Sequence, residues 1–159
     1  MAAIEVKIGE LAVATGGEEL TASALGSCVV IALYDPTRKI GALAHTVLPN
    51  APHPAPPHVI PGMEGSQRAR YVELAIVETL RRLAAVGVRK EDLQAKLIGG
   101  ANMFAHDFPM DIGQANVVRA REVLQKEGIP VVGEVVGGSI GRSMEFSVAS
   151  GIVTVKMKL

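Results

Sequence analysis

Short apolar runs bounded by turn-forming residues constrain the fold most strongly. One such run, "CVVIALY" (28–34), is closed by "DPTRK", where Pro36 pre-sets a turn and Asp35 can bond its own backbone. "IGALAHTVLP" (40–49) follows and predicts a partner strand. Aromatic residues make up only 3% of the chain and tryptophan is absent, so an aliphatic core has to hold these strands together.

Two longer segments have helical periodicity instead. Apolar positions recur at helical spacing from Arg68 to Ala85, and Gly87 is expected to end that helix. A second amphipathic helix is predicted in "QANVVRAREVLQKEG" (114–128). Further strands are predicted in "IEVKIG", "LQAKLIGG" and "IPVVGEVVGG", with a hairpin in "SMEFSVASGIVTVKMK" and a loop over "TGGEELTAS". The pattern indicates an α+β class with a mixed, mainly antiparallel β-sheet core flanked by two main helices.

Length and charge narrow the class of partner. The 159 residues suit a single domain over 1–159, and 16 basic side chains cancel 16 acidic ones. This balance argues against nucleic acid or an anionic membrane as the main partner. No apolar run approaches the roughly 18 to 20 residues that span a bilayer, and "MAAIEVKIGE" is charged where a secretory signal is apolar. We therefore expect a cytoplasmic protein without direct membrane insertion.

A proline-rich loop is predicted over 49–66. Six of the nine prolines fall between Pro49 and Pro61, and a loop of this length is typical of a lid or a mobile segment. The role of this loop stays open. It contains His53 and His58, but two histidines without a carboxylate or cysteine at ligand spacing do not make a metal site, so no metal is expected.

Cys28 is the only cysteine and cannot form an internal disulfide. If the following turn is centred between Pro36 and Thr37, strand pairing places Cys28 opposite His45, with Cβ atoms about 5 Å apart. A thiolate is a nucleophile, and a neighbouring histidine can take its proton. Backbone amides near Gly26 and Ser27 would then stabilise an oxyanion.

A structural interpretation stands beside this chemical one. Free cysteine is among the most buried residue types and often packs as a small apolar group. Cys28 is then a core residue, and His45 a hydrogen-bonded histidine of the same core. The joint placement of the two favours chemistry without deciding it.

Several motifs follow one another from about Val6 to Lys156 and read "ALGSC", "HTVLP", "KLIGGANMF", "IGQAN", "GIPVV", "VGGSIGRSMEF" and "SGIVTVK". In this order they resemble the motifs of one known family, the chemoreceptor glutamine deamidases (CheD). The resemblance implies a cysteine hydrolase that converts glutamine side chains of methyl-accepting chemotaxis receptors to glutamate and releases ammonia. It places the nucleophile at Cys28 and the histidine at His45, requires no cofactor, and implies a fold similar to toxin-type cysteine deamidases.

The resemblance is imperfect around the histidine. The family usually has a threonine six residues before the cysteine, where it orients the histidine, and this chain has Ala22 there. Thr21 is the favoured replacement, through a local bulge that absorbs one extra residue, and Ser23 is the second choice. Ala24 replaces the usual first glycine of the motif.

Two further residues retain the family pattern. Asn116 and Arg142 are candidates for contacts with the substrate backbone, while a capping asparagine and a surface arginine are the plainer alternatives. Gly26, Ser27 and Ser23 complete the set of candidate oxyanion or substrate contacts.

Three functions remain in competition. The leading one is deamidation of cytoplasmic receptor helices. The alternative is a non-catalytic regulatory partner of a CheC-type chemotaxis phosphatase, and a third is a peptidase or small-amide hydrolase that uses the same pair. The sequence leaves open which glutamines are modified, whether a phosphatase binds, and how many copies assemble.

Overall fold

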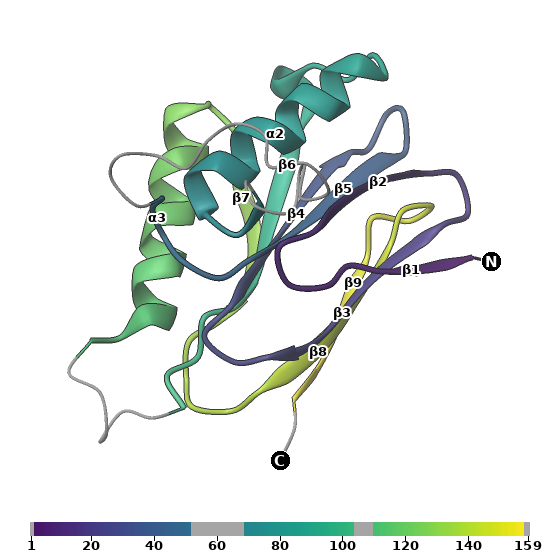
Figure 1. Cartoon of the computed structure of the whole chain (residues 1–159). Helices are drawn as coiled ribbons and strands as arrows, with labels where there is room; N and C mark the ends of the chain where they lie inside the picture. The colour runs from purple at the N-terminus through teal and green to yellow at the C-terminus, as the bar shows by residue number, and fades with distance from the viewer. Residues whose placement is uncertain (1, 52–68, 104–109, 158–159) are drawn as a thin grey trace, which may run out of the picture.

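The chain forms two β-sheets and two α-helices packed in three layers (Figure 1). The computed structural model describes residues 2–51, 69–103 and 110–157. The five-stranded sheet has the order β2-β5-β4-β6-β7, and the four-stranded sheet has the order β1-β3-β8-β9. Both helices cover one face of the five-stranded sheet, and the four-stranded sheet covers its other face.

The elements have the following bounds. The five-stranded sheet contains β2 (Leu11–Thr15), β4 (Val29–Asp35), β5 (Ile40–Thr46), β6 (Gln94–Gly99) and β7 (Val131–Val136). The four-stranded sheet contains β1 (Ala3–Glu5), β3 (Glu19–Leu25), β8 (Arg142–Ser147) and β9 (Val153–Met157). The helices are α2 (Val72–Ala85) and α3 (Ile112–Lys126), with a short 3₁₀ turn η1 (Lys90–Asp92) before β6.

The α+β class and both helices are confirmed, but the arrangement differs from the expected single sheet. Two sheets face one another, so only one sheet carries helices. The segment predicted as a loop over 15–23 contains most of β3, and β2 was not predicted. A tight turn at Gly16 separates these strands, and the polar residues of β3 belong to its outward-facing positions, which concealed the alternation.

The β4 strand lies at the centre and is buried along its whole length. Val29, Ile31 and Leu33 face the helices, because they share a hydrophobic cluster with residues of α2 and α3. The alternating positions Val30 and Ala32 face the four-stranded sheet, in a cluster that also contains Cys28. The face that carries Cys28 is therefore the interior between the two sheets.

The β6-α3-β7 segment forms a parallel crossover on one side of β4. The Asp111 side chain accepts a hydrogen bond of 2.9 Å from the amide of Gln114 and thereby caps the start of α3. This crossover brings the N-terminal turn of α3 over the end of β4 where Cys28 lies.

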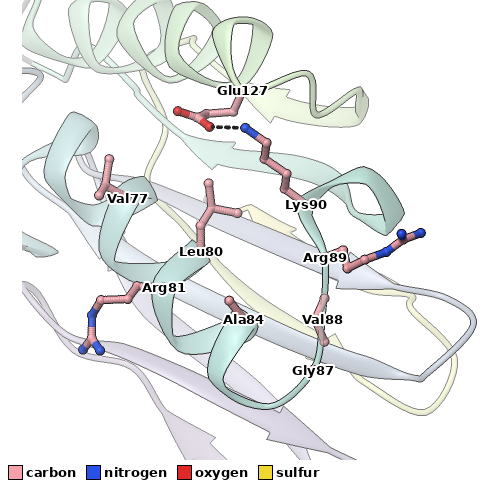
Figure 2. Close-up of a pocket in the computed structure, with 9 residues that line it drawn as sticks. All are labelled: Val77, Leu80, Arg81, Ala84, Gly87, Val88, Arg89, Lys90 and Glu127. Atoms are coloured by element: carbon pink, nitrogen blue, oxygen red, sulfur yellow. Dashed lines mark hydrogen bonds and ion pairs between the residues drawn. The ribbon is translucent and has the colours of Figure 1, made fainter.

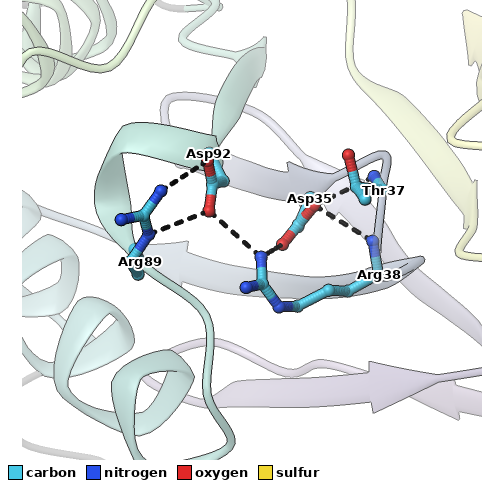
Figure 3. A network of polar contacts seen from close by, with 5 residues as sticks. All are labelled: Asp35, Thr37, Arg38, Arg89 and Asp92. Atoms are coloured by element: carbon cyan, nitrogen blue, oxygen red, sulfur yellow. Dashed lines mark hydrogen bonds and ion pairs between the residues drawn. The ribbon is translucent and has the colours of Figure 1, made fainter.

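The β4–β5 turn fixes the register of the central hairpin (Figure 3). The Asp35 carboxylate is fully buried and accepts hydrogen bonds from the amides of Thr37 and Arg38 at 2.9 and 3.1 Å. Burial raises the pKa of Asp35, but the bonds from Arg38 and Thr37 outweigh it and hold the pKa below its usual range. Arg38 also pairs with Asp92, which ties the turn to the segment before β6.

This turn corrects the predicted pairing. Asp35 pairs with Ile40, so the turn is centred one residue later than expected, between Thr37 and Arg38. The residue opposite His45 is consequently Val30, not Cys28. Because the shift displaces the pairing by two residues, Cys28 and His45 still lie on the same face of the sheet.

The predicted bulge in β3 is confirmed. The pairing of β3 with β8 shifts between Ala22 and Leu25, and Ala24 within this bulge has a φ of 56°. The C-terminal hairpin of β8 and β9 is also confirmed, with Met144 and Phe146 buried on its inner face. Among the helices of the described residues, none is long and apolar enough to cross a lipid bilayer.

Candidate active site

Cys28 directly precedes β4, and its side chain lies between the two sheets. It is 9% exposed and packs in the inter-sheet cluster. His45, near the end of β5, is 2% exposed and occupies the same face. The two are diagonal neighbours, whose backbones lie about 7–8 Å apart in an antiparallel pair. No hydrogen bond joins the two side chains in this structure.

One ring nitrogen of His45 is held by the backbone. Nδ1 lies 2.9 Å from the carbonyl oxygen of Val6, so this nitrogen carries the proton and donates it to that acceptor. Nε2 is therefore a lone-pair acceptor, and it is buried without a hydrogen-bond partner among the described residues. Burial lowers the pKa of His45, and the Val6 bond and the charge of Glu10 only partly oppose this. The ring is a neutral base.

The structure corrects the assignment of the orienting residue. Leu20 and Ala22 face the inter-sheet cluster, so the Thr21 side chain between them faces the other side of β3. Ser23 is exposed in the bulge. Thr21 contributes only through its backbone, because its carbonyl accepts the Val6 amide at 2.8 Å. The group that orients His45 is a backbone carbonyl, not a hydroxyl.

The Cys28 thiol is protonated in the resting protein. Burial raises its pKa, and the smaller effects of its own backbone amide and of the Arg70 charge oppose this without cancelling it. The balance favours the protonated thiol over the thiolate in the resting protein.

Two glycines bring β6 against the cysteine. The Gly100 amide donates to the Cys28 carbonyl at 2.8 Å, and the Ala101 amide donates to the Gly26 carbonyl at 2.9 Å. Gly99 has a φ of 115°, and any Cβ placed on it would collide with the Cys28 carbonyl oxygen. The chain's own backbone, not a substrate, makes the close approach that Gly99 and Gly100 permit.

Asn116 is not exposed to substrate. It is fully buried in α3, and its Nδ2 donates 2.9 Å bonds to the carbonyls of Ser27 and Val47. These carbonyls belong to the segments beside Cys28 and His45. Asn116 therefore links, from the α3 side, the segment beside Cys28 to the segment beside His45. Both a substrate contact and a helix cap are excluded for it.

Arg142 is not a surface residue either. It is 2% exposed and donates hydrogen bonds to the carbonyls of Val135, Gly137 and Ile140. Burial lowers its pKa. Arg142 holds the connection between β7 and β8, which corrects the expectation that it contacts substrate.

One described cavity lies away from Cys28 and His45. A cavity of about 510 Å³ opens between α2, the residues after it and the end of α3 (Figure 2). The Lys90–Glu127 ion pair, at 3.1 Å, closes one side of it. Its base is aliphatic, and its lining contains no cysteine, serine, threonine or histidine. The lining residues are Val77, Leu80, Arg81, Ala84, Gly87, Val88, Arg89, Lys90 and Glu127.

The proline-rich loop predicted over 49–66 lies almost entirely in 52–68, outside the described residues, as do His53 and His58. Within the described ranges, no group of three or more histidine, cysteine, aspartate or glutamate residues is arranged to hold a metal ion.

A family model described as CheD chemotactic sensory transduction matches residues 52–157. The chain belongs to the CheD family. A relative from Geobacter metallireducens, named "Probable chemoreceptor glutamine deamidase CheD 2", is 44% identical over 96% of this chain and 92% of its own length. A relative from Methanococcus maripaludis, named "Probable chemoreceptor glutamine deamidase CheD", is 37% identical over 96% of this chain and 94% of its own. A crystal structure of a Neisseria meningitidis DUF152-family protein covers 87% of this chain and 63% of its own, with a TM-score of 0.49 and 14% identity.

Three features of this CheD protein were missed in the sequence analysis. The Val6 carbonyl gives no side-chain signal, because any residue there supplies the same acceptor. Glu10 acts on His45 only because β2 lies beside β5, and β2 was not predicted. Arg70 reaches Cys28 because its carbonyl accepts the amides of Val47 and Leu48 at 2.8 and 3.0 Å. Its position next to the "YVELA" helix start was the one available clue.

Proposed function

We propose that this CheD protein is a chemoreceptor glutamine deamidase with Cys28 as the nucleophile and His45 as the general base. The observation that carries the proposal is the His45 ring, which offers a buried, unpartnered Nε2 on the face that also carries Cys28. Relatives that match nearly the whole chain are named for this activity.

The first half of the reaction forms a thioester. Nε2 of His45 takes the thiol proton as the Cys28 sulfur attacks the side-chain carboxamide carbon of glutamine. The C–S bond forms, and the carbonyl π electrons move to the oxygen. The C–N bond then breaks, and the imidazolium gives its proton to the nitrogen, which leaves as ammonia.

The second half hydrolyses this thioester. A water molecule loses a proton to Nε2 of His45 and attacks the same carbon. The C–S bond breaks, the sulfur recovers a proton from the imidazolium, and the side chain leaves as glutamate. Both halves use one base, and neither requires oxidation, reduction or a metal.

The oxyanion of each tetrahedral intermediate needs hydrogen-bond donors. The amide N–H of Cys28 donates to no other backbone group among the described residues. It is the first candidate donor. The amides of Gly26 and Ser27 are further candidates, since no acceptor among the described residues engages them.

The substrate we propose is a glutamine on a cytoplasmic helix of a chemoreceptor, which implies a cytoplasmic location for the enzyme. Binding to a CheC-type phosphatase stays a prediction. A purely regulatory role is less well supported, because a non-catalytic chain has no need for an unpartnered buried base beside its one cysteine.

Mass spectrometry of a chemoreceptor cytoplasmic fragment tests this function. After incubation with the purified protein, specific glutamines are expected to gain about one dalton, and Cys28→Ala and His45→Ala are expected to abolish the gain. Thr154→Ala, on an outward-facing position of β9, serves as the matched control and keeps full activity.

Two outcomes would refute the proposal. Deamidation that persists in Cys28→Ala excludes Cys28 as the nucleophile. Unchanged receptor mass, together with cleavage of peptide bonds or of free amides, would instead indicate the peptidase or small-amide hydrolase.

A further inference from the structure

Asn116 joins two backbone segments that the proposed reaction requires. Its Nδ2 donates to the Ser27 carbonyl, directly before Cys28, and to the Val47 carbonyl, two residues after His45. One amide group uses both of its protons on these carbonyls. The two carbonyls therefore point to the α3 side of the sheet.

The bond from Asn116 to the Ser27 carbonyl also sets the direction of the Cys28 N–H. The carbonyl of Ser27 and the N–H of Cys28 belong to one peptide unit, and in a planar trans peptide these two groups point in opposite directions. With the carbonyl directed at Asn116, the N–H is directed away from α3. Cys28 packs its side chain on that opposite side, in the cluster between the sheets.

The side-chain oxygen of Asn116 lacks a hydrogen-bond partner within the described part of the chain, which supports a role of this residue beyond packing. Its Oδ1 is buried and has no hydrogen-bond partner among the described residues. A buried oxygen that is left without a hydrogen-bond donor destabilises the fold. An aliphatic side chain would fill the same volume but leave the carbonyls of Ser27 and Val47 without this donor, so the role of Asn116 lies in the two bonds it makes.

We propose that Asn116 is a positioning residue that aims the backbone N–H of Cys28 at the oxyanion formed during attack. This inference rests on the proposed deamidase function. Asn116 does not contact the reacting atoms. It acts by holding the Ser27–Cys28 peptide in the one rotation that presents the N–H beside the sulfur.

Two different reactions of the same thiol separate this role from general support of the fold. Deamidation passes through an oxyanion, whereas alkylation by iodoacetamide displaces iodide at a saturated carbon and forms none. Loss of one oxyanion donor typically lowers kcat by about 10²–10³-fold. The test compares Asn116→Ala and Asn116→Leu with the wild-type protein. It measures kcat and KM for the receptor fragment and the alkylation rate of Cys28.

The expected result is a kcat lower by about 10²-fold or more, with KM and the alkylation rate each within about 3-fold of wild type. Val123→Ala is the matched control, because Val123 is a buried residue of the same helix that packs only in the helix-side cluster. It should lose stability and keep kcat. A kcat within 3-fold of wild type in the Asn116 variants, or a parallel fall in kcat and alkylation rate, overturns the inference.

A second measurement needs no variant to be active. A peptide with glutamate semialdehyde in place of glutamine adds to the Cys28 sulfur: the C–S bond forms, the C=O π bond breaks, and the thiol proton moves to His45. The resulting oxygen occupies the oxyanion position. In NMR spectra of the wild-type protein, the Cys28 amide proton should move strongly downfield, and in folded Asn116→Ala it should not.

The two measurements also separate the proposals. A wild-type protein that leaves every receptor glutamine unchanged contradicts the proposed function, and the aldehyde experiment then decides on Asn116 alone. If the Asn116 variants do not fold, the wild-type amide shift decides. An unmoved Cys28 amide in the wild-type adduct overturns the inference in either case.

Discussion

The imidazole Nδ1 of His45 lies 2.9 Å from the carbonyl oxygen of Val6, and this bond determines which nitrogen of the ring can act as a base. Val6 is itself held by the 2.8 Å bond from its amide to the Thr21 carbonyl. In the proposed mechanism, the backbone of β3 and of the residues after β1 thus takes the place of the third side chain that orients the histidine in many cysteine–histidine enzymes. A backbone acceptor cannot be lost by substitution of a side chain.

Activity should persist to a lower pH than an exposed histidine allows. Burial lowers the pKa of His45 below the usual value of about 6.5, so the neutral base survives further into acid. The acid limb of kcat/KM, which reports the free enzyme, is expected below pH 6.5. An acid limb at or above pH 6.5 contradicts this. The same shift has a stability consequence: its contribution is complete above pH 6.5 and is lost as pH falls through the lowered pKa.

Alkylation of Cys28 should follow a titration above the ordinary range for a thiol. Burial raises the thiol pKa, so the rate with iodoacetamide should keep rising with pH beyond about 8.5. Arg70→Gln is expected to move the midpoint further upward, because it removes a positive charge that favours the thiolate. A rate that reaches its plateau below pH 8 would indicate a preformed thiolate–imidazolium pair and contradict the neutral resting state.

Gly99→Ala should disrupt the site far more than Gly128→Ala. Both glycines have positive φ, so both substitutions incur about 1–2 kcal/mol of backbone strain. Gly128 has open space around it, whereas a Cβ on Gly99 collides with the Cys28 carbonyl. Denaturant unfolding is expected to show a loss of more than about 3 kcal/mol for Gly99→Ala. Equal losses in the two variants would show that the close approach is not needed.

Ala24→Gly should stabilise the protein. Ala24 has a φ of 56°, which costs an L-residue about 1–2 kcal/mol, while glycine loses about 0.5–1 kcal/mol in unfolded-chain entropy. The net gain expected in chemical denaturation is about 0.5 kcal/mol. Ser23→Gly, at the neighbouring exposed position, is the control and should lower stability. A loss of stability in Ala24→Gly would exclude strain at this bulge.

Apolar spacing predicted the secondary-structure elements well where the buried residues follow the period of a helix or a strand. The β4 run, both helices and the C-terminal hairpin followed from apolar spacing, and the stop at Gly87 was confirmed by its positive φ. The second sheet was missed because the polar outward-facing residues of β3 concealed its alternation, and because β3 pairs with β8, which is distant in the sequence. Pairing between distant strands is not encoded in any local period.

The candidate site was predicted in its residues but not in its geometry. Counting along one hairpin placed Cys28 and His45 on a shared face, and an error of one residue in the turn changed a direct pair into a diagonal one. Asn116 and Arg142 were recognised as candidates for substrate contacts, with a helix-capping asparagine and a surface arginine as the alternatives. Their burial depends on how α3 and the β7–β8 connection pack, which is tertiary information.

Trapping the covalent intermediate tests the central claim most directly. A receptor peptide mixed with the protein and quenched in acid should yield protein with the mass of enzyme plus peptide minus ammonia, and fragmentation should place the adduct on Cys28. His45→Ala should form little or none of it. An active protein that never carries this adduct, or carries it on another residue, would contradict the account.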